Sequence, residues 1–316
     1  MRKQPARHLA RHLARHPARH PARHPSRRPA RRPARPLARL LTVLAALTAL
    51  LCHATGVAAP RAAAADEWNP PSNLVQPLNE VWNHVSTTYP DLYGFRNYGW
   101  DQVMANKGSI NYCVRWESDA PVSTTLRDQI HAALKKQFAK WMAAQVENGR
   151  AYNNWPYTTV PVNIVGWAVK NRSTLQWTDN SVDIYSGVLD GAGAPQCAPD
   201  CGRFFHQDAN YSRCPGGTAR HYDQSLWLTK GFQGGAGGDW GQRVGQEYFT
   251  GVLNQENIHI YLHEVGHTFG LDDFYDWTPT GQCCFLMNAG SATQITDFDK
   301  WMLRDFWRHL KPRYNL

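Results

Sequence analysis

The sequence predicts a fold of the α+β class, and three observations indicate it. Residues 110–116 alternate with the period of a β-strand. Residues 124–149 carry apolar side chains at helical spacing, with Thr124 or Thr125 as the expected cap and Gly149 as the stop. Two more helical stretches follow near the C-terminus. The order is therefore strand, long helix, several strands, helix, loop and terminal helix.

The other elements follow from shorter patterns. We expect a helix over 74–85 and strands over 160–169, 182–185 and 224–229. Residues 231–241 are rich in Gly and are expected to form a mobile loop. A helix capped by Asn254 or Asn257 is expected to run through His267, and Thr296 is expected to cap the last helix.

Basic residues are concentrated at the N-terminus, so the formal net charge of +9 is misleading. Residues 1–65 hold fourteen of the 34 Lys and Arg and none of the 25 Asp and Glu, which leaves residues 66–316 with a net charge of −5. Nucleic-acid binding would rest on the basicity of the whole chain, so we expect no nucleic-acid partner.

Residues 1–65 have the three parts of a secretory signal. A basic repeat covers 6–37, an apolar run extends over 40–51, and small residues fill 58–65. The apolar run is too short to span a bilayer as a stable helix. We therefore expect cleavage near Ala59 or Ala65, a secreted extracellular protein and no stable association with a membrane. Residues 66–109 would be a propeptide or part of the fold, and 110–316 the main domain.

Seven Cys are present, and Cys52 lies within the signal. An even number in an exported chain predicts three disulfides with open connectivity. The alternative is a second metal site around Cys197, Cys201 and Cys214. The six candidates are Cys113, Cys197, Cys201, Cys214, Cys283 and Cys284.

The segment 263–275 carries the strongest chemical signal. His263 and His267 are four residues apart, so a helix presents both imidazoles on one face. A catalytic Zn²⁺ ion takes three protein ligands and keeps a position for water. Glu264, beside the first imidazole, is placed to act as general base on that water.

The third ligand comes after a turn. Gly270 permits the chain to leave the helix, and Asp273 follows three residues later. Asp272 is the alternative, although the register favours Asp273. His259 lies one turn before His263. It either contacts the metal ligands from outside or simply begins the helix.

This motif resembles that of the metzincin metallopeptidases, and within them the snapalysin group of small streptomycete neutral proteases. The resemblance implies a metzincin-like twisted mixed sheet with a long backing helix, a zinc-binding active-site helix, a Met-turn and a C-terminal helix. It implies that residues 110–316 form a catalytic domain, a zinc metalloendopeptidase acting on proteins or peptides. It also implies Asp273 as third ligand and Tyr275 as a residue that stabilises the transition state.

The resemblance extends to the segment 283–288. By similarity, Met287 forms an apolar floor below the metal and is not a ligand. Cys283 matches the Cys that precedes that Met in the family. The family's second Cys has no counterpart here, so we expect a bridge from Cys283 or Cys284 to run backward to Cys113 or to the 197–214 group, with two different partners for the two adjacent Cys. The match covers residues 263–290, and elsewhere only the order of elements agrees.

A second function class remains open. All thirteen Trp follow residue 65, which would suit a secreted carbohydrate-binding or adhesion protein with aromatic platforms for a polysaccharide surface, with or without protease activity. Core packing is the simpler role for Trp. We expect a monomer and one catalytic Zn²⁺, and no motif supports a structural Ca²⁺. The residues named as exposed candidates are Trp82, Trp100, Trp155, Trp177, Trp240 and Trp277.

Overall fold

A six-stranded mixed β-sheet forms the centre of the structure, a computed structural model that describes residues 63–66 and 68–316. Its strands, in order, are β6 (Asp183–Ser186), β5 (Val162–Val169), β2 (Ile110–Glu117), β7 (Gln224–Thr229), β9 (Gly241–Gly245) and β8 (Gly235–Gly238). All neighbours are parallel except β8, which runs antiparallel to β9 at the end of the sheet. This mixed α/β fold with a mostly parallel sheet is compatible with the predicted α+β class.

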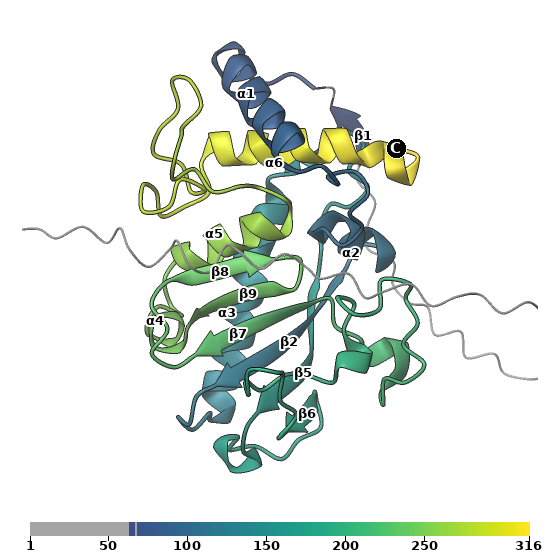
Figure 1. Cartoon of the computed structure of the whole chain (residues 1–316), viewed down its shortest axis with the longest axis vertical. Helices are drawn as coiled ribbons and strands as arrows, with labels where there is room; N and C mark the ends of the chain where they lie inside the picture. The colour runs from purple at the N-terminus through teal and green to yellow at the C-terminus, as the bar shows by residue number, and fades with distance from the viewer. Residues whose placement is uncertain (1–62, 67) are drawn as a thin grey trace, which may run out of the picture. The chain divides into compact units, whose positions relative to one another are not determined.

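Helices pack around this sheet (Figure 1). α5 (His259–Thr268) packs on β8, β9 and the long helix α3 (Thr124–Ala143), whereas α1 (Ser72–Thr88) packs on α6 (Asp297–Leu310). The described residues also form α2 (Gly99–Ala105), α4 (Gln246–Gly251) and a small sheet of β1 (Ala63–Asp66), β4 (Arg150–Tyr152) and β3 (Val146–Glu147). None of the described helices is long and apolar enough to cross a bilayer.

The segment before β2 packs into the same core as the rest of the described chain. Leu78 of α1 is buried, and the Trp82 ring stacks on His309 of α6 at 3.6 Å and meets Phe306 edge-on. Residues 68–109 are thus integrated into the fold described here. The predicted signal over 1–65 lies outside the described residues except for 63–65.

Most predicted elements are confirmed, with shifted ends. Thr296 caps α6 as expected, and residue 110 begins β2. α3 is capped by Ser123, whose hydroxyl accepts from Leu126 N, and it ends at Ala143, not at Gly149. Gly149 instead sits at φ +77° between β3 and β4, a conformation that suits Gly.

The Gly-rich segment 231–241 was wrongly expected to be a loop. Its middle forms β8, and Gly235 and Gly237 permit the close packing of this strand on α5. A Cβ at Gly237 would lie 2.2 Å from the backbone oxygen of Glu264. The predicted Asn caps of α5 are also wrong, because Ile258 occupies the cap position without a side-chain hydrogen bond. α2, β3, β4 and the separate helix α4 were not predicted.

Two disulfides, not three, are present among the described residues. They join Cys113 on β2 to Cys197, and Cys201 to Cys214. A Cβ at Gly166 on the neighbouring strand would lie 2.9 Å from the Cys197 sulfur, so Gly166 leaves room for the first bridge. The expected backward bridge from residue 283 or 284 is therefore wrong, since its partners are already paired. The alternative Cys-bound metal site is excluded for the same reason.

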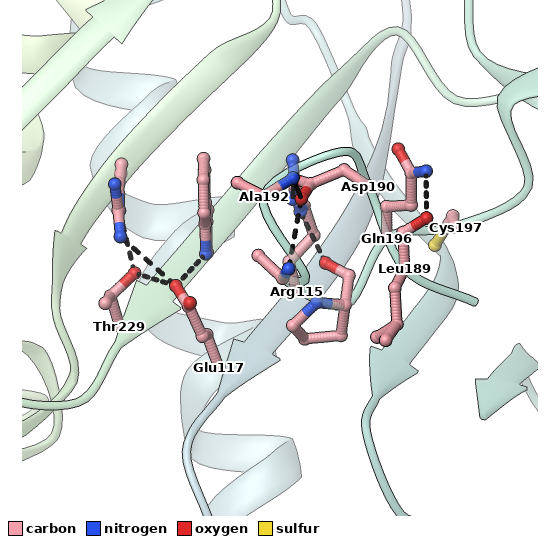
Figure 2. A network of polar contacts seen from close by, with 12 residues as sticks. Arg115, Glu117, Leu189, Asp190, Ala192, Gln196, Cys197 and Thr229 are labelled. Atoms are coloured by element: carbon pink, nitrogen blue, oxygen red, sulfur yellow. Dashed lines mark hydrogen bonds and ion pairs between the residues drawn. The ribbon is translucent and has the colours of Figure 1, made fainter. Parts of the chain in front are cut away.

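The loop before Cys197 is held on the sheet by Arg115 of β2 (Figure 2). The guanidinium donates to the carbonyl oxygen of Pro195 at 2.7 Å and pairs with the Asp190 carboxylate. The other oxygen of Asp190 accepts from the amides of Ala192 and Ala194. These contacts fix the loop that leads into the first disulfide.

Candidate metal centre

Three side chains converge where α5 ends. His263 and His267 lie one turn apart, with their Nε2 atoms 3.2 Å from each other. Asp273 Oδ1 lies 3.0 Å from His263 Nε2 and 3.4 Å from His267 Nε2. Ligands bound to a tetrahedral ion at about 2.0–2.1 Å are about 3.3 Å apart. The three predicted ligands therefore have the spacing that one small metal ion requires, and they are the group of this kind found in the described part of the chain.

The opposite nitrogen of each ring is engaged by the backbone. His263 Nδ1 lies 2.9 Å from the Leu286 carbonyl oxygen, and His267 Nδ1 lies 2.8 Å from that of Leu271. A carbonyl only accepts, so each Nδ1 carries the proton and each Nε2 presents its lone pair in the neutral ring. The backbone thus selects the tautomer suited to metal binding.

A turn at Gly270 brings Asp273 to the imidazoles. Gly270 has φ +90°, and a Cβ there would lie 2.3 Å from the Phe306 ring, so both the conformation and the space require Gly. Asp272 points to other partners: its carboxylate accepts from the Tyr89 hydroxyl at 3.0 Å and from the amide of Asp273. The structure therefore brings Asp273, and not Asp272, to the two rings.

The ionisable side chains at this site shift one another's pKa values. Burial alone would lower the pKa of His267, but hydrogen bonding to Asp273, the nearby Glu264 carboxylate and the Leu271 carbonyl raise it to about 9. Burial would raise the pKa of Asp273, and the two imidazoles outweigh it and lower that pKa. Without a metal, the site therefore retains a proton on imidazole, which a cation would displace.

Glu264 lies beside the cluster without joining it. Its side chain is buried, and Oε2 is 3.8 Å from His267 Nε2. Burial raises the pKa of this carboxyl, although the two imidazoles act in the opposite direction. Gly235 of β8 packs directly on it, because a Cβ there would lie 2.2 Å from Oε1. The β8 strand thus holds the carboxylate in place, a role that sequence reasoning missed.

Tyr275 lies at the exposed side of the cluster. Its side chain is more than half exposed, and its hydroxyl is close enough to the carboxylates of Asp273 and Glu264 to interact electrostatically with both. Partial burial and the carboxylates of Asp273 and Glu264 raise the pKa of this hydroxyl, so it stays protonated near neutral pH. An un-ionised donor is therefore available next to the ligands.

Met287 lies beneath α5 and is fully buried. A Cβ at Gly266 would lie 2.4 Å from its sulfur, so Gly266 creates the space that Met287 fills. Asp299 of α6 accepts from the amides of Leu286 and Met287 at 2.8 and 3.1 Å, which fixes the carbonyl that orients His263. The sequence signal for Asp299 is its position three residues after the capping Thr296, but its contact with the distant turn could not be foreseen.

The other sequence candidates lie elsewhere. His259 begins α5 and its Nδ1 is 2.9 Å from the Tyr248 hydroxyl, as expected for a residue at the start of the helix. None of the thirteen Trp is exposed: eight are buried and five half-buried. Of the Trp residues considered as candidates for exposure, Trp100, Trp155 and Trp177 pack in the core, which is the simpler role given above. The structure thus gives no support to an aromatic platform for polysaccharide.

Two imidazoles, one carboxylate, a neighbouring buried carboxylate and a tyrosine hydroxyl form a compact reactive group. Such a set can hold a divalent ion, accept a proton beside it and donate a hydrogen bond. No family model matches this chain, and no curated protein matches it either. Functional inference therefore rests on this geometry.

Proposed function

We propose that this protein is a secreted zinc-dependent endopeptidase. The observation that carries the proposal is the spacing of His263, His267 and Asp273, with Glu264 buried beside them. Two imidazoles and a carboxylate are a donor set that suits Zn²⁺ and that leaves a coordination position open. The two disulfides agree with export to an oxidising compartment.

In this proposal, the zinc ion, Glu264 and Tyr275 each have a separate role in peptide hydrolysis. The zinc ion, when bound, supplies Lewis acidity toward water and toward the scissile carbonyl. Glu264 accepts the proton of the attacking water and passes it to the leaving amine, a role that its burial and raised pKa favour. The Tyr275 hydroxyl donates a hydrogen bond to the oxygen that gains negative charge.

The sheet edge offers a place for an extended substrate. β8 pairs with β9 on one side only and stands at the end of the sheet order. An extended peptide can add to such an edge as a further strand. Because Gly235 of β8 contacts Glu264, a peptide bound there lies next to the proposed base. We include in the proposal a metzincin-like architecture, with Met287 below the ligands as in that family's Met-turn.

The test uses secreted protein or a chain that starts at Asp66. Bound zinc is measured per chain, and an internally quenched peptide blocked at both ends reports cleavage within the chain. We expect about one zinc per chain and hydrolysis that a chelator abolishes and added zinc restores. Absence of hydrolysis in zinc-loaded protein, or hydrolysis that a chelator leaves unchanged, would refute the proposal.

A further inference from the structure

Two adjacent thiols lie on the surface of the loop that precedes the Met287 turn. Cys283 and Cys284 are both exposed, and their sulfur atoms are 2.8 Å apart. A bonded pair of sulfurs is about 2.05 Å apart, so a small movement closes the gap. The other four described Cys are already joined in pairs. Each of these thiols therefore has the other as its nearest sulfur partner within the described chain.

The backbone places both sulfurs on the same side. Successive side chains of an extended chain point in opposite directions, but Cys284 has φ +63° in the left-handed region. A residue other than Gly adopts this conformation only where the surrounding structure holds it. The restraints are visible on both sides of the pair: Thr280 N donates to Glu80 Oε2 at 2.6 Å, and the amide of Leu286 donates to Asp299. The loop is thus arranged for a bond between neighbours.

We propose that Cys283 and Cys284 form a vicinal disulfide, which makes this loop a reversible oxidation site. In the reaction, a low-molecular-weight disulfide of the glutathione or cystine type is the oxidant. One Cys thiolate attacks it, releases one small thiol and forms a mixed disulfide. The second Cys thiolate then displaces the second small thiol, so that two protein thiols become one bond and the small disulfide is reduced to two thiols. The inference does not depend on the proposed peptidase activity.

The proposed disulfide between Cys283 and Cys284 differs from the other two disulfides in its exposure to solvent. The sulfurs of the Cys113–Cys197 and Cys201–Cys214 bridges belong to buried residues, whereas residues 283 and 284 are exposed. Exchange requires access of the attacking thiolate to the disulfide. A mild dithiol reductant should therefore open the bond between neighbours first and leave the buried bridges closed.

The test counts thiols and maps peptides. Secreted protein, or a chain that starts at Asp66 and so lacks Cys52, is incubated in oxidised-glutathione buffer and then denatured, alkylated and digested without reduction. We expect no titratable thiol and a peptide with both Cys two hydrogens lighter than its dithiol form. Brief treatment of the native protein with dithiothreitol should expose two thiols per chain, and phenylarsine oxide, which bridges neighbouring thiols, should bind at one per chain.

Two variants make the result specific. Cys283→Ser and Cys284→Ser should each show one titratable thiol, bind no phenylarsine oxide stably and keep both buried bridges. Because both side chains are exposed, neither variant removes core packing. Two alkylated thiols in the oxidised wild type would overturn the proposal. So would two attached glutathiones, a disulfide-linked dimer, or a bond from either residue to Cys113, Cys197, Cys201 or Cys214.

Discussion

The packing of Gly235 on Glu264 makes a direct test of how the base is held. A Cβ at residue 235 would lie 2.2 Å from Glu264 Oε1, whereas ordinary contacts begin at 3.4 Å. Gly235→Ala must therefore displace the carboxylate by about 1.2 Å or force a new rotamer. A misplacement of about 1 Å costs on the order of 100-fold in rate, which corresponds to about 2.7 kcal/mol.

The assay separates this effect from loss of metal or of fold. Zinc content and the unfolding midpoint of Gly235→Ala should stay near wild type, because the three atoms nearest to the added Cβ all belong to Glu264 and none to the three proposed ligands, and because the φ of residue 235 lies outside the left-handed range. The kcat for a blocked peptide should fall about 100-fold. Gly191→Ala is the matched control, since a Cβ there meets no atom within 4 Å. Wild-type kcat in Gly235→Ala would show that β8 does not position the base.

Three further predictions concern the ligands and the stability of the fold. The Asp273→Asn variant should lose zinc and activity, and Asp273→His should regain part of the zinc. The Asp272→Asn variant should keep about one zinc ion per chain. If only Asp272→Asn loses zinc, the assignment of Asp273 as the third ligand is wrong. Because the pKa of His267 is about 9 without metal, zinc affinity measured against a competing chelator should fall about tenfold for each pH unit below 9, and an affinity that is constant between pH 6 and 8 would contradict this. Burial raises the pKa of Asp305 from 3.8 to about 6 despite Arg308, so between these pH values the folded state binds more protons than the unfolded state and the free energy of unfolding falls as pH rises. In urea denaturation, Asp305→Asn should remove this pH dependence and raise the free energy of unfolding by up to about 3 kcal/mol at pH 7. An unchanged pH dependence in the variant would exclude Asp305 as its source.

Local patterns predicted the elements whose signals are local. The period-two run at 110–116 became β2, and Thr296 capped α6, because these features depend on neighbouring residues alone. The ligand motif was equally local: spacing on one helix and one Gly turn suffice to bring His263, His267 and Asp273 together.

Features that depend on contacts between distant residues could not be predicted from the sequence. Glycine is depleted in strands, yet residues 235–238 form β8, and Gly235 and Gly237 lie where a Cβ would collide with Glu264 of α5. Asp299 serves the Met287 turn twelve residues away, through contacts that no periodicity encodes. The disulfide connectivity could not be predicted for a similar reason, since the pairing of Cys113 with Cys197 depends on the loop before Cys197 being held against β2 by Arg115.

The central claim is that Glu264 acts on water beside a bound zinc ion, and the Glu264→Gln variant tests it most directly. The measurement is zinc content together with single-turnover hydrolysis of a blocked peptide, in wild type and variant side by side. We predict unchanged zinc stoichiometry and a rate lower by at least about 100-fold, since positioned acid–base groups contribute on the order of 10²–10⁴. A zinc-loaded Glu264→Gln protein that cleaves the peptide at the wild-type rate would contradict the account.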